Sequence, residues 1–183
     1  MGAAQTPQPV KLIIGLLGTS EALLSATTAA LCERFGSVDA ASAPTPWTFS
    51  SYYQAEMGDT VLRQFISFDR LIAPGKLAGV KQLTNEIEER WRGPRGRQVN
   101  VDPGYIAALK LVLATTKDAG HRVYLSGGMY GEVTLEFRDG TFIAAAHTYP
   151  YYAAGPAVTF FNGVRSTYLL QLRQVSTDTP YAS

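Results

Sequence analysis

Apolar and polar positions over the first 101 residues predict a strand, helix, strand, strand, helix, strand order. Residues 10–17 form an almost continuous apolar run, which is typical of a central strand buried on both faces. Two segments repeat apolar residues every three or four positions, the spacing of amphipathic helices, at 20–36 and 77–91. Aromatic and β-branched residues predict the other strands at 47–57, 60–69 and 98–101.

This order is that of a ferredoxin-like βαββαβ sandwich over residues 10–101, in which two helices cover one face of an antiparallel sheet. Gly58-Asp59 marks the turn of a hairpin, and residues 37–47, with two prolines, read as a loop or an irregular edge. The expected fold class is therefore α+β. The other face of the sheet is left for the remaining chain or for a ligand.

The chain beyond residue 101 is expected to extend this core. A helix over 103–118 is favoured by Asp102 as N-cap, Pro103 at the first helical position and a later glycine. The alternative is a strand, because the leucines at 109, 111 and 113 alternate. An antiparallel β-meander follows at 122–125, 131–137 and 141–147, with a hairpin turn at Arg138-Asp139-Gly140. A closing C-terminal helix is predicted over 160–172.

Length and composition favour one α+β domain at 10–173, between a flexible leader at 1–9 and a flexible tail at 174–183. A formal net charge of +1 lacks the positive excess of a dedicated nucleic-acid binder. Cys32 is the single cysteine, so an intrachain disulfide is excluded. No apolar run approaches the roughly 20 residues of a membrane helix. A cytoplasmic protein without a membrane partner is expected, and the oligomeric state is left open.

Polar and basic residues gather beside predicted element ends between residues 97 and 152, the usual placement of a binding site on a rigid scaffold. Lys117 and Arg122 bracket a turn and can clamp a phosphate, Arg122 through paired hydrogen bonds. Glu132 on the next strand is placed to contact Arg122. His121 with Asp102 or Glu132 is the candidate for acid–base chemistry. Further ligand-binding candidates are Tyr105, Tyr124, Thr19 and Ser20.

Each candidate has a structural alternative. Thr19 and Ser20 lie between a strand and a helix, where they can hold an anion or simply cap the helix. Lys117 and Arg122 can instead form ion pairs with Asp118 and Glu132. No cofactor is identified. The two histidines, His121 and His147, cannot make a zinc site alone, and Mg²⁺ at Asp102, Glu132 and Glu136 has weak support.

The predicted function is binding of a phosphorylated or nucleotide-like small molecule, with acid–base processing as an extension and enzymatic activity left open. The alternative is an RNA-binding or protein-interaction module. It would use the basic segment 90–97 and an aromatic sheet face. The aromatic RNA signature is absent. The aromatic residues in question are Phe49, Tyr52, Tyr53, Tyr105 and Tyr124.

Five ordered motifs resemble one bacterial family. They are TFSSYYQAEMG at 48–58, KQLTN at 81–85, VNVDPGY at 99–105, ATTKD at 114–118 and HRVYL at 121–125. Together they resemble the family catalogued as domain of unknown function 4416, over about residues 9–172. The resemblance implies a stand-alone cytoplasmic domain and no assigned activity. The chain departs from the family at Ala107-Ala108, where polar residues are usual, and at Tyr151, where an acidic residue is common.

Overall fold

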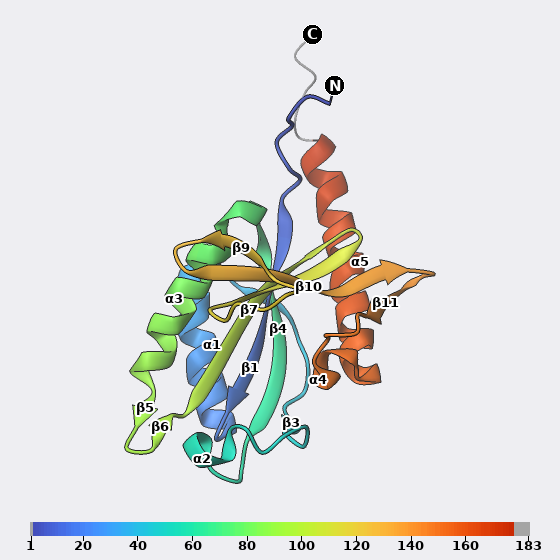
Figure 1. Cartoon of the computed structure of the whole chain (residues 1–183). Helices are drawn as coiled ribbons and strands as arrows, with labels where there is room; N and C mark the ends of the chain where they lie inside the picture. The colour runs from blue at the N-terminus through green and yellow to red at the C-terminus, as the bar shows by residue number, and fades with distance from the viewer. Residues whose placement is uncertain (1, 178–183) are drawn as a thin grey trace.

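A computed structural model describes residues 2–177 as a mixed α/β fold built on a large antiparallel sheet (Figure 1). The sheet contains β1 (Val10–Gly18), β2 (Val38–Ala41), β3 (Thr45–Pro46), β4 (Leu62–Ile72), β7 (Val99–Ala107), β8 (Lys110–Thr115), β9 (Val123–Ser126), β10 (Met129–Arg138) and β11 (Thr141–Ala144). The helices are α1 (Glu21–Phe35), α2 (Gln54–Met57), the 3-10 turn η1 (Pro74–Lys76), α3 (Leu77–Arg90), α4 (Pro150–Ala153) and α5 (Gly155–Thr177). A separate small hairpin joins β5 (Arg92–Gly93) and β6 (Gly96–Arg97).

The strand order is β11-β10-β8-β7-β1-β4-β2, with β3 beside β4 and β9 beside β10. The first strand, β1, therefore lies between β4 and β7 and pairs with both in antiparallel register. Every residue of β1 is buried. Leu12 and Ile14 belong to the core cluster under α1 and α3, whereas Ile13 belongs to the cluster under α5. The predicted burial of a central strand on both faces is confirmed.

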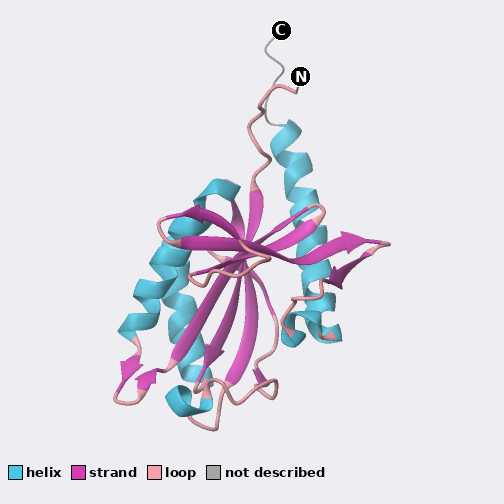
Figure 2. Cartoon of the chain, in the orientation of Figure 1, coloured by secondary structure: helices cyan, strands magenta, loops and turns pink. Residues whose placement is uncertain are grey.

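Helices cover both faces of the sheet. Figures 1 and 2 show α1 and α3 together on one side and α5 on the other. Phe161, Val164 and Tyr168 of α5 pack against Leu111 and Leu135 of the sheet. Helix α5 therefore covers the second face of the sheet, which the sequence had left for the remaining chain or for a ligand. The closing helix begins at Gly155 and runs to Thr177, through the first residues of the expected tail. Residues 178–183 of that tail lie outside the described part.

The predicted helix over 103–118 is wrong. Strand β7 continues through Asp102-Pro103-Gly104, and β8 returns beside it as an antiparallel partner. Gly104 allows this close pairing, because a Cβ there would lie 2.4 Å from the Val112 carbonyl oxygen. The glycine therefore serves close strand approach, not a turn, and the leucine alternation was the correct signal. Leu111 and Leu113 are buried, while Leu109 lies in the turn and is exposed.

The predicted strand over 47–57 is also wrong. Residues 47–53 form a loop and α2 follows. The strands that pair with β4 on this side are β2 and the short β3, both inside the segment expected to be irregular. The aromatic residues that suggested a strand pack on one another. The Trp47 ring centroid is 5.5 Å from that of Phe49 and 5.5 Å from that of Tyr53. Aromatic richness here reflects a side-chain cluster and not a pleated strand.

Several local predictions are confirmed. Ser20 caps α1, with its Oγ accepting from the Leu23 N–H at 3.2 Å. Asp139 and Gly140 both have positive φ angles, 52° and 81°, as a tight hairpin turn between β10 and β11 requires. The expected strands β9, β10 and β11 form two antiparallel hairpins, but they are not a meander, because β8 pairs with one edge of β10 and both β9 and β11 pair with the other. Among the residues that the structure describes, no helix is long and apolar enough to cross a membrane.

Candidate functional site

The site lies where β7 and β8 separate. β7 pairs with β1 from Val99 to Ile106 but with β8 only from Gly104 to Ala107. Before Gly104, side chains of α3 bind the edge of β7 that β8 leaves open. The Val101 N–H donates to Glu88 Oε1 at 2.7 Å, and the Val101 carbonyl accepts from Lys81 Nζ at 2.7 Å. Helix α3 thus satisfies a strand edge that would otherwise be left unpaired.

Pro103 explains why the pairing stops. Backbone groups of successive strand residues point to alternate edges, so Pro103 faces the same edge as Val101, away from β1. Proline has no N–H and cannot donate to a neighbouring strand there. The ladder between β7 and β8 accordingly begins one residue later, at Gly104 opposite Leu113. Before Gly104 the two strands are not paired, and the space between them is part of a cavity.

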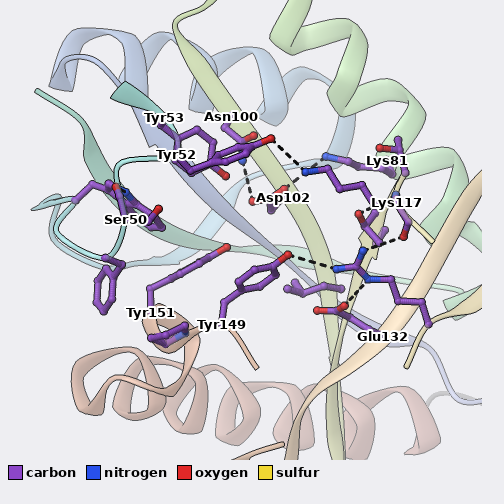
Figure 3. Close-up of a pocket in the computed structure, with 18 of the residues that line it drawn as sticks. Ser50, Tyr52, Tyr53, Lys81, Asn100, Asp102, Lys117, Glu132, Tyr149 and Tyr151 are labelled. Carbon is purple, nitrogen blue, oxygen red and sulfur yellow. Dashed lines mark hydrogen bonds and ion pairs between the residues drawn. The ribbon is translucent and has the colours of Figure 1, made fainter. Parts of the chain in front are cut away.

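This cavity has a volume of about 380 Å³. Figure 3 shows tyrosines from two segments, with Asp102 between them and Lys81, Lys117 and Glu132 at one end. The lining residues come from the loop after β3, α3, the β6–β7 stretch, the end of β8 and its loop, β10 and the start of α4. They are Trp47, Phe49, Ser50, Tyr52, Tyr53, Lys81, Arg97, Asn100, Asp102, Leu113, Ala114, Thr115, Thr116, Lys117, Arg122, Glu132, Tyr149, Pro150 and Tyr151.

Six aromatic side chains line the cavity in two groups, which together are called the aromatic wall. The rings of Tyr52 and Tyr53 meet edge to face at 5.0 Å, and those of Tyr149 and Tyr151 stack at 5.7 Å. Trp47 joins the two groups, because its ring lies 4.9 Å from that of Tyr151. Such contacts fix the rings without filling the cavity, which leaves flat apolar surface and hydroxyl groups to face a ligand.

Arg122 holds three segments together at the charged end. Its Nε donates to Glu132 Oε2 at 2.7 Å, one terminal nitrogen to the Lys117 carbonyl at 2.9 Å, and the other to the Tyr149 hydroxyl at 3.3 Å. The predicted contact between Arg122 and Glu132 is confirmed. The Arg122 pKa is raised, because burial lowers it but the hydrogen bonds that Arg122 donates to Glu132 and Tyr149, with the charge of Glu132, together outweigh that effect. Arg122 is therefore a fixed cation.

Lys117 is the second cation of this end. It is exposed, and its Nζ lies 3.2 Å from the Tyr52 hydroxyl and 5.1 Å from the centre of that ring. The contact combines a hydrogen bond with a cation–π interaction. Lys117 thus links the loop after β8 to the aromatic wall while its charge stays accessible.

A chain of hydrogen bonds runs along the cavity floor. Glu56 accepts from Arg97 Nε at 2.9 Å, Arg97 donates to Asn100 Oδ1 at 2.7 Å, and Asn100 Nδ2 donates to Asp102 Oδ2 at 2.8 Å. Lys81 Nζ lies 3.6 Å from Asp102 Oδ1. This chain joins α2, which directly follows the loop that carries Tyr52 and Tyr53, to Asp102 on the cavity floor.

Burial shifts several pKa values around the cavity. Burial, with the nearby charge of Asp102, raises the pKa values of Tyr53 and Tyr151, so both phenols remain hydrogen-bond donors at neutral pH. Burial also raises the pKa of Glu88, more than the neighbouring Lys81 lowers it. For Glu56 the balance is opposite, because hydrogen bonds from Arg97 outweigh burial and hold its pKa below the ordinary value.

The structure brings four of the predicted site residues together. Asp102, Lys117, Arg122 and Glu132 all line the cavity. His121 lies just outside the lining, where its Nε2 is 3.2 Å from Glu132 Oε2 and its ring stacks on His147 at 4.2 Å. Glu132 itself is buried and also approached by Thr134.

The other predicted residues lie elsewhere. Tyr105 is three positions from Asp102 on the same strand, so it faces the opposite side of the sheet, where it packs against the cluster around Leu77. Tyr124 is exposed on β9. Thr19 and Ser20 are absent from the lining, and the hydrogen bond of Ser20 is that of a plain helix cap.

Sequence reasoning missed much of the lining. Trp47 was interpreted as a strand residue, and Tyr149 and Tyr151 were not named as site residues, although they lie in the stretch 97–152 where the site was expected. Lys81 had a clearer signal, because a charged residue on the apolar stripe of an amphipathic helix indicates a buried ion pair. Lys81 is in fact buried and lies 3.7 Å from Glu88.

Two alternative sites have little geometric basis. Within residues 2–177, no group of three or more His, Cys, Asp or Glu side chains is placed to hold a metal ion. The basic segment 90–97 forms the end of α3 and the β5–β6 hairpin. Arg97 there pairs with Glu56 and Glu88, and Arg92 pairs with Glu89.

Comparison with known proteins gives the family. The family model described as Domain of unknown function (DUF4416) matches residues 8–168. The chain belongs to this family. The DUF4416 match runs from β1 into α5 and so includes every residue that lines the cavity. Neither a curated protein nor a solved structure matches the chain.

Proposed function

We propose that the cavity binds a phosphorylated, nucleotide-like small molecule. Its ring would lie against the tyrosines, and its anionic group would point toward Lys117 and Arg122. The observation that carries this proposal is the union of an aromatic wall and two cations in one cavity of about 380 Å³. Such a volume lies within the usual range of small-molecule sites, about 300–1,000 Å³.

The two cations have complementary roles in this proposal. Three of the five N–H groups of Arg122 are held by residues of the described chain, which fixes the guanidinium in place. A phosphate can bind the remaining N–H groups without reorganising the site. Lys117 is exposed and can turn from Tyr52 toward the phosphate. Aromatic stacking then supplies affinity for the ring.

The proposal is for binding and assigns no proton transfer. A general acid or base must come within hydrogen-bond reach of the reacting group, and His121 lies outside the lining. The rival proposal, an RNA contact through residues 90–97, has weaker support, because Arg92 and Arg97 are engaged by glutamates.

Thermal-shift measurements with mononucleotides, phosphosugars and divalent ions test the proposal. A ligand at about 100 times its dissociation constant stabilises a protein by roughly 2.7 kcal/mol. We expect a mononucleotide to raise the melting temperature, Lys117→Ala to remove that shift, and Lys110→Ala, outside the lining, to keep it.

The binding proposal is wrong if no nucleotide or phosphosugar shifts the melting temperature. It is also wrong if Lys117→Ala leaves the shift intact. Salt-sensitive binding of single-stranded RNA that is lost in the triple variant Arg92→Ala, Arg95→Ala and Arg97→Ala would favour the rival instead.

We also propose a ferredoxin-like core, a single domain and a cytoplasmic location for this protein. The order β7-β1-β4-β2 of the first four main strands, with α1 and α3 on one face, supports a ferredoxin-like core within one domain. The unpaired Cys32 fits a reducing, cytoplasmic compartment. Limited proteolysis tests the domain claim, since release of two folded halves near residue 100 would contradict it.

A further inference from the structure

Asp102 faces the cavity with hydrogen-bonding capacity to spare. Its Oδ2 accepts from Asn100 at 2.8 Å, its Oδ1 lies 3.6 Å from Lys81 Nζ, and its side chain is 29% exposed. A carboxylate has sites for about four hydrogen bonds. Glu132, the other acid of the lining, is 2% exposed and already held by Arg122. Asp102 is therefore the acid in this lining that a ligand can reach.

The neighbours of Asp102 fix its orientation. Arg97 can only donate, so Asn100 must turn its Oδ1 toward Arg97 and its Nδ2 toward Asp102. Asp102 Oδ2 is thereby occupied by Asn100, and Oδ1 faces Lys81 and the cavity. An ionised carboxylate only accepts hydrogen bonds. A ligand group placed against Asp102 must therefore be a donor.

Lys81 supplies the opposite chemistry next to this acid. It is buried, lines the cavity, and uses one N–H on the Val101 carbonyl at 2.7 Å. Its other contacts, to Asp102 and Glu88 at 3.6 and 3.7 Å, are ion pairs longer than hydrogen bonds. The floor thus presents an acceptor, Asp102 Oδ1, and a donor, Lys81 Nζ, 3.6 Å apart.

We infer that the ligand carries a ring with an exocyclic amine next to a ring nitrogen, the amidine-type edge of aminopyrimidines and 6-aminopurines. The amine donates to Asp102 and the ring nitrogen accepts from Lys81. The corresponding carbonyl ring, with C=O and N–H at these positions, turns an oxygen toward Asp102 and a hydrogen toward Lys81. This inference rests on the proposed function and names its ring class.

The ratio of affinities for the two ring types can be estimated. A site that hydrogen-bonds one partner rejects an analogue that leaves its charged groups unpaired. A hydrogen bond to a charged group corresponds to a factor of roughly 10 to 100 in affinity. We therefore expect CMP to bind about 10- to 100-fold more tightly than UMP, and AMP more tightly than IMP by a similar factor.

Isothermal titration of the full chain with these four nucleotides tests the inference, together with the variants Asp102→Asn and Asp118→Asn. In Asp102→Asn the new amide must accept from Asn100 through its oxygen, so its NH₂ group faces the cavity. The preference for CMP and AMP should then be lost, because the amine of CMP or AMP now meets an NH₂ group, while the N–H of UMP or IMP still meets Lys81. Asp118→Asn removes the same charge from an exposed position outside the lining and should keep the wild-type preference.

Outcomes for the ring and for the cavity are distinguishable. Equal binding of both members of each pair by the wild-type chain overturns the ring assignment and leaves the proposed function standing. No binding of any of the four overturns the proposed function and this inference with it. A variant Asp102→Asn that folds and keeps the preference for amines also overturns the role of Asp102. If that variant does not fold, the wild-type affinity ratios alone decide.

Discussion

Arg122 Nε donates to Glu132 Oε2 across 2.7 Å, and the two side chains are 8% and 2% exposed. This buried pair lies at the start of the β9–β10 hairpin and reaches both the Lys117 carbonyl and the Tyr149 hydroxyl through Arg122. It connects the loop after β8, strand β10 and the segment before α4. The charged end of the cavity depends on this connection for its shape.

We expect Arg122→Lys to destabilise the protein even though it keeps the charge. An ammonium cannot reproduce the planar fork that reaches three partners, and Glu132 would stay buried with a weaker counter-charge. The loss should be about 1–3 kcal/mol in the free energy of unfolding, measured by urea denaturation. Arg138→Lys, at the exposed β10–β11 turn, is the matched control and should change little. A variant as stable as the wild type would show that the fork contributes nothing to folding.

Gly104→Ala tests the close approach of β7 and β8. The new Cβ would lie 2.4 Å from the Val112 carbonyl oxygen and 2.6 Å from Leu113 Cδ2, so the strands must move apart. Overpacking of this kind typically costs about 1–3 kcal/mol. The melting temperature should fall, whereas Gly120→Ala, with no atom within 4 Å of its Cβ, should leave it nearly unchanged. Equal melting temperatures for both variants would contradict the register.

Glu56 should contribute to the pH dependence of stability. Hydrogen bonds from Arg97 outweigh burial and hold the folded-state pKa of Glu56 below its ordinary value of 4.5. A depressed folded-state pKa stabilises the protein above the unfolded-state pKa, and this contribution is lost as the pH falls through the folded-state value. The stability difference between the wild type and Glu56→Gln should therefore be constant near pH 7 and shrink below about pH 4.5. Chemical denaturation at several pH values measures it, and a difference that grows on acidification would refute the assignment.

The sequence allowed prediction of elements whose local signals agree with the fold. Residues 10–17 are continuously apolar because β1 is buried on both faces, and Ser20 is a cap in both sequence and structure. The prediction of a helix at 103–118 was wrong because the sequence Asp-Pro-Gly is compatible with two different structures. At a helix start they are a cap and a first turn, but in β7 Pro103 ends a ladder and Gly104 admits a neighbouring strand.

In the candidate site, too, residues with a local sequence signal were predicted and those brought together by long-range contacts were not. Arg122, Glu132, Lys117 and Asp102 were recognised because charged residues stand beside element ends. The aromatic wall depends on contact between residues about 100 positions apart, such as Trp47 and Tyr151, which no local pattern encodes. Tyr105 was misplaced for a simpler reason. Once 99–107 is known to be a strand, its odd separation from Asp102 places the two on opposite faces.

Trp47 offers the most direct measurement of ligand binding. The chain has two tryptophans, and Trp47 lines the cavity whereas Trp91 does not. In a Trp91→Phe variant the emission reports on Trp47 alone. Titration with AMP, CMP, GMP and UMP should give a saturable change in emission for at least one of them, and Lys117→Ala should remove it. Emission that does not saturate with any of the four, or that changes equally in Lys117→Ala, would contradict nucleotide binding in this cavity.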